Sequence, residues 1–183
     1  MPPVLDVKRY AAEVIIEPAA IADVEAVLPM VEAICRFHER LDPARYDYLP
    51  DVVDRYRRWL PQRASDPRSV FLVARPQAGT PPVGFLVAGT ESNIPIYRTD
   101  AFGYIHDVWV EPGFRGRGLA TGMVAECLRR FRGMGVTQVR LETAAANEPA
   151  RRLFAAAGFR SDAITMLQAF GEPAANTGRG PGR

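Results

Sequence analysis

The sequence predicts an α+β fold of the three-layer α/β kind, in which a mixed sheet of six to seven strands carries about four helices on its faces. Short apolar runs bounded by proline, glycine and turn residues are typical of strands. Longer segments repeat apolar residues every three to four positions, as amphipathic helices do. The segments follow one another in the order βααβββαβαβ. Tight turns between the early strands favour antiparallel pairs, and the late strand–helix–strand unit favours a parallel pair.

The first part of the chain supplies four of these strands and two of the helices. The first helix has an apolar stripe that starts at Ile21 and returns at Val24, Leu28 and Val31. The second helix has a poorer pattern, and Pro61 is expected to limit its last turn. The strands are expected at Val14–Pro18, Ser69–Pro76, Val83–Thr90 and Gly103–Val110, and the helices at Ile21–His38 and Asp51–Arg63.

The rest of the chain supplies two more helices and two more strands. Asn147 is a good N-cap for the second of these helices, and Gly158 is expected to end it. We expect one domain over residues 14–170, preceded by a weakly determined arm at 1–13 and followed by a disordered tail at 171–183 that has no apolar pattern. The helices are expected at Gly116–Phe131 and Asn147–Ala157, and the strands at Thr137–Ala144 and Ala163–Phe170.

Composition and charge argue against several classes of function. The length of 183 residues suits one domain, and a net charge of +2 is small for a dedicated nucleic-acid-binding protein. No apolar run approaches the ~18 residues of a membrane span and the N-terminus lacks the apolar core of a signal peptide, so we expect a cytoplasmic protein. Cys35 and Cys127 fall within helical apolar patterns and are expected to pack in the core. Four-ligand metal spacing is absent, so no metal site is expected.

The stretch EPGFRGRGLATG, at Glu111–Gly122, is typical of a turn that binds phosphate at the start of a helix. The first N–H groups of a helix have no partner within it and attract anions. Glycine lets a ligand approach the backbone closely, and arginine adds positive charge. The alternative is a purely structural turn. The residues expected at the phosphate are Arg115, Gly116, Arg117, Gly118, Leu119, Ala120 and Thr121.

Two segments together resemble the Gcn5-related N-acetyltransferases. The first, HDVWVEPGFRGRGLATGMV, carries the signature of that family at Arg115, Gly118 and Ala120. The second, LETAAANEPARRLFAAAGF, resembles a helix of the family that begins at an asparagine and ends in Gly-Phe, here Asn147 and Gly158-Phe159. The resemblance covers about a third of the chain, and the earlier order of elements also fits it.

The resemblance implies a sheet that splays apart and holds acetyl-CoA as the cofactor. The diphosphate would lie on Gly116–Thr121, and the pantetheine arm would pair like an extra strand with the backbone of Val108, Trp109 and Val110. The sheet would part between this strand and the next one along the chain. The side chain of Asn147 would reach the pantetheine from the other side of the gap, or serve only as the helix N-cap.

The reaction implied is direct acetyl transfer to a primary amine of a small molecule or a peptide. An alkylammonium group has a pKa of about 10, so a base must take its proton before the nitrogen attacks. His106 and Asp107 are the expected catalytic residues, and for each the alternative is an ordinary structural role in the strand. Strand alternation puts neighbours on opposite faces, so both can serve only if a bulge turns one of them.

Phe154 departs from the family pattern, which has a tyrosine there as the general acid. A water, Tyr104 or another tyrosine could replace it, or the thiolate could leave unassisted. The departure also supports a second hypothesis, a non-catalytic acyl-CoA-binding or regulatory module. A third hypothesis is a dinucleotide enzyme, since Gly116, Gly118 and Glu142 imitate part of a Rossmann fingerprint.

Substrate selection is expected at the end of the first long helix and in the loop after it. His38 and Arg40 lie there and are the expected substrate-binding residues, and Arg40 could pair with a carboxylate on the amine. The alternative is a solvated helix end. No nucleic-acid or membrane partner is expected, and a homodimer is an expectation from the family only.

Overall fold

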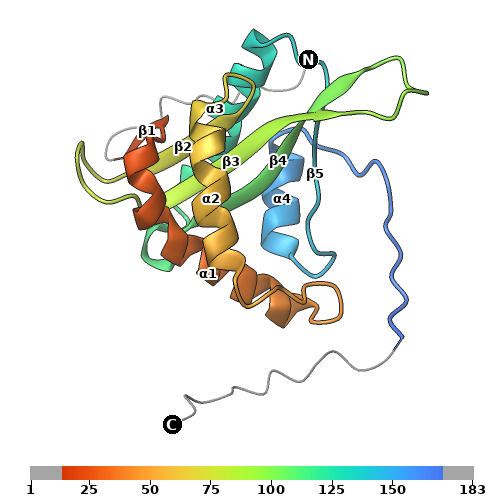
Figure 1. The fold of residues 1–183 in the computed structure, drawn as a ribbon, viewed down its shortest axis with the longest axis horizontal. Helices are drawn as coiled ribbons and strands as arrows, with labels where there is room; N and C mark the ends of the chain where they lie inside the picture. Colours follow the sequence, from red (N-terminus) through yellow and green to blue (C-terminus); the bar gives the residue numbers. More distant parts are fainter. Residues whose placement is uncertain (1–13, 171–183) are drawn as a thin grey trace.

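Within residues 14–170, which the computed structural model describes, the sheet has five strands in the order β1-β2-β3-β4-β5 (Figure 1). The expected arm at 1–13 and the expected tail at 171–183 lie outside the described residues. β1 to β4 pair antiparallel and β4 pairs with β5 in parallel, which confirms the predicted change of pairing. The strands are β1 (Ile15–Pro18), β2 (Val70–Arg75), β3 (Gly84–Ser92), β4 (Ala101–Val110) and β5 (Val139–Leu141).

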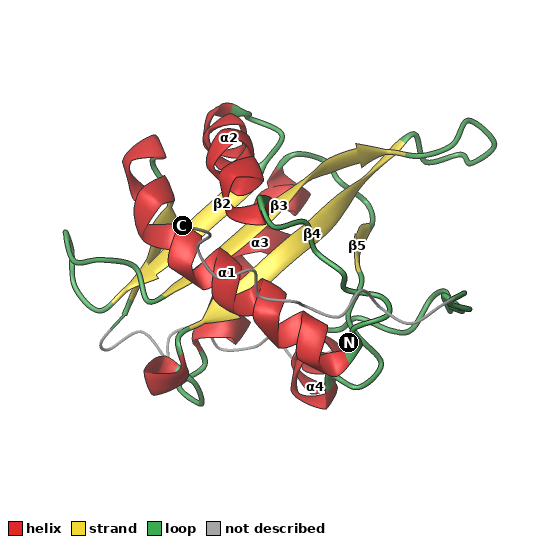
Figure 2. Cartoon of the chain, turned by 60° about the horizontal axis from the view of Figure 1, so that its bottom comes forward, coloured by secondary structure: helices red, strands yellow, loops and turns green. Residues whose placement is uncertain are grey.

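Helices cover both faces of the sheet, which makes the three layers. α1 and α2 pack on one face and α3 and α4 on the other, and Figure 2 shows α1 in front of the sheet with α3 behind it. The predicted α+β class is therefore confirmed. The helices are α1 (Val24–Leu41), α2 (Val52–Ser65), α3 (Leu119–Gly133) and α4 (Glu148–Ala156), with 3₁₀ turns at η2 (Ile21–Asp23) and η3 (Pro112–Phe114).

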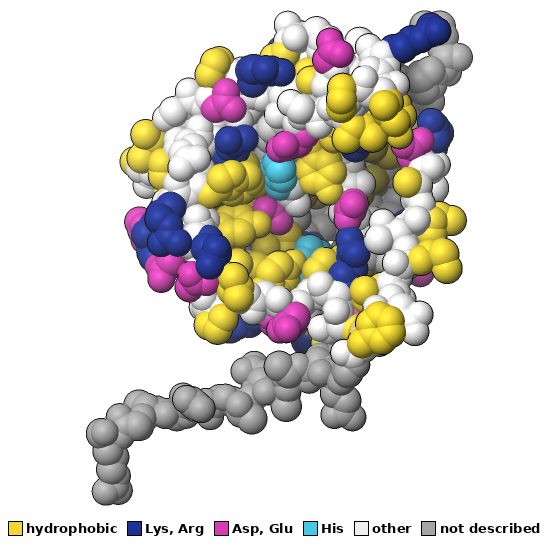
Figure 3. All heavy atoms as spheres, turned by 45° about the vertical axis from the view of Figure 1, so that its right-hand side comes forward, with side chains coloured by type: hydrophobic (Ala, Val, Ile, Leu, Met, Phe, Trp, Pro, Cys, Tyr) yellow, Lys and Arg dark blue, Asp and Glu magenta, His cyan; other side chains and the backbone are white. Residues whose placement is uncertain are grey.

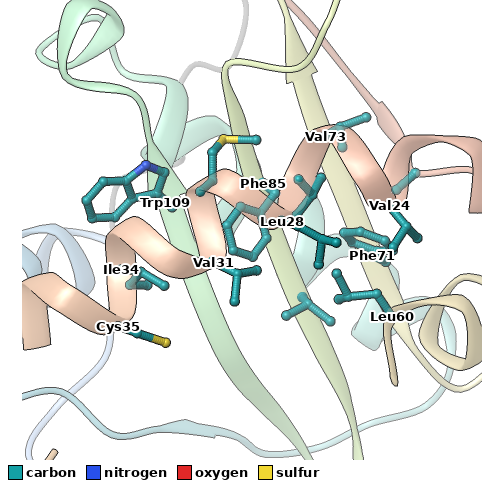
Figure 4. Close-up of a cluster of buried hydrophobic side chains, with 14 residues drawn as sticks. Val24, Leu28, Val31, Ile34, Cys35, Leu60, Phe71, Val73, Phe85 and Trp109 are labelled. Atoms are coloured by element: carbon teal, nitrogen blue, oxygen red, sulfur yellow. The ribbon is translucent and has the colours of Figure 1, made fainter. Parts of the chain in front are cut away.

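Alternation along the strands builds one hydrophobic cluster on each face of the sheet. In β2, Phe71 and Val73 belong to the cluster under α1 and α2, whereas Leu72 and Ala74 belong to the cluster under α3. Figure 4 shows the first cluster, in which side chains of α1 such as Val31 lie against the strands. Burial of each large apolar side chain is worth ~1.5–3 kcal/mol, so the two clusters hold the helices on the sheet.

β4 and β5 pair over only three residues and then separate. Gly103, Tyr104 and Ile105 pair with Val139–Leu141. β4 continues to Val110 alongside β3, and no described strand lies on its other side. An unpaired edge leaves N–H and C=O groups free, so the second half of β4 can receive an extended ligand. The sheet thus parts at the place that the resemblance implied.

The predicted strand at Ala163–Phe170 is wrong, and so is the count of six to seven strands for the described residues. The segment has no regular secondary structure, and its side chains Ile164, Met166 and Phe170 are 89%, 90% and 92% exposed. Its apolar alternation is typical of a strand. A strand also needs a neighbour that satisfies its backbone groups, and no described residue pairs with this segment.

Two smaller expectations also fail. Pro61 lies inside α2, and the helix continues to Ser65 because the next turn still closes with the Asp66 N–H on the Gln62 carbonyl at 3.0 Å. The strand expected at Thr137–Ala144 is reduced to β5, since its pairing with β4 ends where the two strands diverge.

The cysteines occupy the positions predicted for them. Cys35 and Cys127 are buried, free thiols, one in each hydrophobic cluster, so their packing role is confirmed. No helix within residues 14–170 has the length and apolar character needed to cross a membrane. The same residues contain no group of three His, Cys, Asp or Glu side chains that could hold a metal ion.

Candidate active site

The turn before α3 presents a run of free backbone N–H groups. Gly116 and Gly118 have φ angles of 74° and 79°, in the left-handed region that glycine adopts without strain. The N–H groups of residues 116–121, which include Ala120 and Thr121, donate to no acceptor in the described part of the chain. Leu119 is buried and anchors the start of α3. Because these N–H groups lie at a helix N-terminus, they form a site suited to an anion.

Arg115 and Arg117 flank the glycine turn in different ways. The Nε of Arg115 donates to the Val110 carbonyl at 2.8 Å, and its guanidinium lies 4.5 Å from the centre of the Trp109 ring. Arg117 is exposed and packs over Phe114, with 5.4 Å between guanidinium and ring centre. Arg115 therefore joins the turn to the end of β4, and Arg117 supplies the less constrained charge beside the N–H groups.

In the second half of β4, the backbone N–H and C=O groups of two residues point toward the open edge. The Glu111 N–H donates to the Val83 carbonyl of the segment before β3 at 2.9 Å. The N–H and C=O of one residue point to the same side of a strand, and successive residues alternate. Those of Val108 and Val110 therefore point away from β3, and those of Trp109 point toward it. The Trp109 side chain is buried in the cluster under α1. Val108 therefore offers both its N–H and C=O to a ligand, and Val110 its N–H.

A β-bulge brings His106 and Asp107 to the same face of the sheet. Val87 of β3 pairs with Asp107 and Ala88 pairs with Ile105, so His106 has no partner across the ladder. Both side chains consequently contact α2, whereas regular alternation would put them on opposite faces. The geometric condition for the two to act on one substrate is met.

Asp107 is the acidic group of the site. The hydroxyl of Tyr56, on α2, donates to its Oδ2 at 2.8 Å. Burial raises the pKa of Asp107 to about 6, and the Tyr56 hydrogen bond opposes that rise. At pH 7 the carboxylate is mostly ionised, yet it is basic enough to take a proton from a substrate. Burial, with the charge of Asp107 second, raises the pKa of Tyr56, so the hydroxyl stays protonated and remains a donor.

His106 is held by ring packing rather than by hydrogen bonds. Its ring centre lies 5.1 Å from those of both Trp59 and Tyr104. Its Nε2 is buried and 3.5 Å from Oε1 of Glu91, without the geometry of a hydrogen bond. Burial lowers the pKa of His106, the charge of Glu91 opposes this, and that of Arg63 adds to it. The imidazole is therefore neutral at pH 7.

A pocket of about 270 Å³ opens beside these residues, and we call it the aromatic pocket. It is lined by Arg55, Tyr56, Trp59 and His106. The Tyr56 and Trp59 rings meet edge to face at 5.5 Å. Figure 3 shows one face of the molecule, on which histidine side chains surface at two places with hydrophobic and acidic side chains between them. Arg55 is bound to Asp51 at 2.9 Å, so the charge of this lining residue is compensated.

The two expected substrate-binding residues have different surroundings. His38 stacks on Tyr46 with 4.9 Å between ring centres, and its Nδ1 lies 3.4 Å from the hydroxyl of Tyr48. Burial raises the pKa of Tyr48, and the charges of Cys35 and Asp107 add to the rise. Arg40 is exposed and forms no hydrogen bond or ion pair with residues 14–170. The structure thus packs His38 against Tyr46 and Tyr48 and leaves the Arg40 side chain outside these contacts.

Asn147 is the N-cap residue directly before α4, in the segment that follows β5. Its Oδ1 accepts a hydrogen bond from the Ala150 N–H at 3.3 Å, which confirms the N-cap role. The residue is only 8% exposed, and its Nδ2 has no partner within the described residues, so both N–H groups of this amide are available to a ligand. Phe154, farther along the helix, packs against Phe159 with 5.6 Å between ring centres and has no proton to give.

An ion pair joins the loop after α1 to the end of β5. Arg45, in the loop after α1, binds Glu142, directly after β5, at 2.5 Å. Tyr104 lies close to this pair: burial raises its pKa, and the charges of Glu142 and Arg45 act on it in opposite directions. Tyr104 therefore keeps its proton at neutral pH.

Sequence reasoning alone does not find Tyr56 and Trp59 as site residues. The available signal is their spacing of three positions in a predicted helix, which puts both rings on one face. That spacing equally suits an ordinary core face. Only the packing of α2 over the bulge in β4 places these rings beside Asp107.

Comparisons with known proteins show the family and the fold of the chain. The sequence model of the Acetyltransferase (GNAT) family matches residues 32–159, more than half of the chain. No curated protein matches the chain.

Solved structures share the fold at low sequence identity. The GCN5-related N-acetyltransferase from Ralstonia eutropha JMP134 is 22% identical, with a TM-score of 0.66 over 86% of this chain and 98% of that one. A predicted acetyltransferase with acetyl-CoA from Clostridium acetobutylicum is 17% identical, with a TM-score of 0.64 over 85% and 96%. Glucosamine-6-phosphate N-acetyltransferase from Arabidopsis thaliana is 19% identical, with a TM-score of 0.60 over 86% and 99%. These structural similarities show the fold. Because the family model matches more than half of the sequence, the chain belongs to the GNAT family of acetyltransferases.

Proposed function

We propose that the protein transfers the acetyl group of acetyl-CoA to a primary amine of a small molecule or a peptide. The observation that carries the proposal is the run of free N–H groups at residues 116–121, next to an open strand edge that leads back to Asp107. The N–H groups suit the diphosphate, and the free N–H and C=O of Val108 suit an amide of the pantetheine arm. The unpartnered Nδ2 of Asn147 is a further donor for that arm. Membership of the GNAT family supports this assignment.

Bound acetyl-CoA would supply the acetyl group as a thioester. Asp107 would hold the ammonium form of the amine by charge and take one of its protons, which leaves a neutral nitrogen able to attack. The nitrogen then forms the new C–N bond while the C–S bond breaks. It gives up a second proton, the departing sulfur gains one, and one proton in all reaches the solvent. The N–H of Val110 would stabilise the carbonyl oxygen as it gains negative charge.

The pH dependence distinguishes Asp107 from His106 as the base. We expect kcat/KM to fall below about pH 6, because the raised pKa of Asp107 is the point at which the carboxylate becomes protonated and inactive. Tyr56→Phe removes a hydrogen bond that favours the ionised form, so the pKa rises further and the acid limb moves to higher pH. A pH–rate profile of both proteins measures the shift. An acid limb that stays in place in the Tyr56→Phe variant would assign the titration to another group.

Asn147 offers a test of the cofactor contact that leaves the fold intact. In Asn147→Asp the N-cap oxygen is kept and the Nδ2 donor is lost, so we expect unchanged thermal stability and an acetyl-CoA affinity lower by roughly tenfold. Asn147→Ala is the comparison, since it removes the cap as well and lowers stability by about 1 kcal/mol. Calorimetric titration and thermal unfolding measure the two effects. Equal affinity of Asn147→Asp and the unmodified protein would remove Asn147 from the cofactor site.

The packing of Phe154 in a hydrophobic contact favours a second candidate function, a non-catalytic acyl-CoA-binding module. Release of free CoA thiol from acetyl-CoA, measured with a broad panel of primary amines, separates the two. An enzyme raises thiol release above the uncatalysed rate with at least one class of amine. Tight binding of acetyl-CoA with no thiol release across the panel would support the binding module.

A further inference from the structure

We infer that the acceptor is a small primary amine carried on an aromatic or compact apolar group and free of anionic substituents. The inference rests on the proposed function and names the substrate class of that site. It is carried by the aromatic pocket, which Tyr56 joins to Asp107: the ring of Tyr56 lines the pocket, and its hydroxyl binds the carboxylate at 2.8 Å. An amine whose nitrogen is at Asp107 therefore has its carbon skeleton beside the pocket.

The walls of the pocket favour an apolar skeleton. Trp59 meets the Tyr56 ring at 5.5 Å and the His106 ring at 5.1 Å, edge to face in both cases. Mutually packed rings present rigid apolar surface, and an aromatic group gains edge-to-face contacts in addition to burial. A sugar would lose hydrogen bonds from its hydroxyl groups to water on entering the pocket, and the aromatic walls would replace few of them. This loss would cost binding free energy.

The charges around the pocket disfavour an anionic acceptor. Arg55 is bound to Asp51 at 2.9 Å, and the guanidinium of Arg63 lies 3.9 Å from Asp66. Arg55 therefore already faces a carboxylate. The guanidinium of Arg63 packs over Trp59 at 5.5 Å, and its Nε is buried and out of contact with solvent. Asp107 adds a negative charge beside the pocket. A carboxylate or phosphate on the substrate would be repelled by Asp107, and it would have to compete with Asp51 for Arg55.

The volume of the pocket suits a small group. Its 270 Å³ lies below the ~300 Å³ at which small-molecule pockets usually begin, so it accommodates one ring with a short arm. The pocket is open to the surface, so a substrate can enter it from solvent.

Three matched amines test the inference: phenethylamine, phenylalanine, which adds a carboxylate, and ethylamine, which lacks the ring. We expect kcat/KM for phenethylamine to exceed each of the other two at least about tenfold. A value for phenylalanine equal to or above that for phenethylamine would overturn the exclusion of anions. A value for ethylamine equal to that for phenethylamine would overturn the role of the aromatic walls.

Equilibrium binding of phenethylamine to the full-length chain, measured by calorimetry, tests the pocket without turnover. We expect Trp59→Ala to weaken this binding at least about tenfold and Trp59→Phe to keep it within about threefold, because the phenyl ring preserves an aromatic wall. Acetyl-CoA affinity is the control and should match the unmodified protein in both variants. Phenethylamine binding without acetyl transfer would reject the proposed function and keep the pocket assignment. Transfer to other amines with no phenethylamine binding would reject the pocket assignment and keep the function.

Discussion

Replacing Asp107 with asparagine is expected to lower kcat by about 10²–10⁴-fold while acetyl-CoA binds as tightly as before. The amide keeps the shape of the carboxylate, but it can neither take a proton nor hold an ammonium group by charge. Thiol release measures kcat, and calorimetric titration measures the cofactor affinity. Asp100→Asn, an exposed site in the β3–β4 hairpin, is the matched control and should change neither quantity.

The same substitution is expected to make the protein more stable at neutral pH. The folded-state pKa of Asp107, about 6, lies above its ordinary value of 3.8, so the folded protein binds this proton more tightly than the unfolded chain. The contribution of Asp107 to the free energy of unfolding therefore falls as pH rises through the window between these two values. Asp107→Asn removes this pH-dependent loss of stability. Urea denaturation at pH 7 should therefore show a free energy of unfolding higher by up to about 3 kcal/mol. Lost activity together with lower stability would indicate damage to the fold instead of loss of the base.

Gly118→Asp is expected to weaken acetyl-CoA binding more than about 100-fold, which corresponds to about 2.7 kcal/mol. The residue has a φ of 79°, a conformation that aspartate tolerates better than most side chains. Its carboxylate would add negative charge beside the N–H groups that are assigned to the diphosphate, where a second anion is repelled. Calorimetric titration with acetyl-CoA and with CoA measures the loss, and both ligands should lose affinity alike because they share the diphosphate.

Gly113→Asp is the matched control for this variant. Gly113 has an ordinary φ, and a Cβ placed there meets no atom within 4 Å, so the same charge is added five positions earlier without strain. We expect its acetyl-CoA affinity to stay within about tenfold of the unmodified protein. An equal loss in both variants would mean that net charge, and not the turn itself, controls binding.

The parts of the fold that were predictable from sequence are those whose signals are local. The stripe through Val24, Leu28 and Val31 specifies a helix because all three residues lie on one face. Alternation in β2 likewise specifies a strand buried on both faces. The segment at Ala163–Phe170 has a similar local pattern but finds no partner among the described residues. Strand pairing is a contact between distant segments, and a local pattern does not reveal whether a neighbour exists.

The same distinction applies to the site. The free N–H groups of residues 116–121 were predictable, since glycines directly before a helix leave these donors exposed whatever the rest of the chain does. The bulge at His106 was not, because it arises from the register between β3 and β4. Nor was the bond from Tyr56 to Asp107, which joins residues 51 positions apart. The chemistry of the base therefore depends on contacts that only the folded chain displays.

The central claim is that the N–H groups of residues 116–121 bind the diphosphate of acetyl-CoA. A crystal structure of the complex tests it most directly. We predict diphosphate oxygens within about 3 Å of at least three of these nitrogens, and a pantetheine arm paired with Val108 along the open edge of β4. A diphosphate bound elsewhere, with these N–H groups left to solvent, would contradict the account.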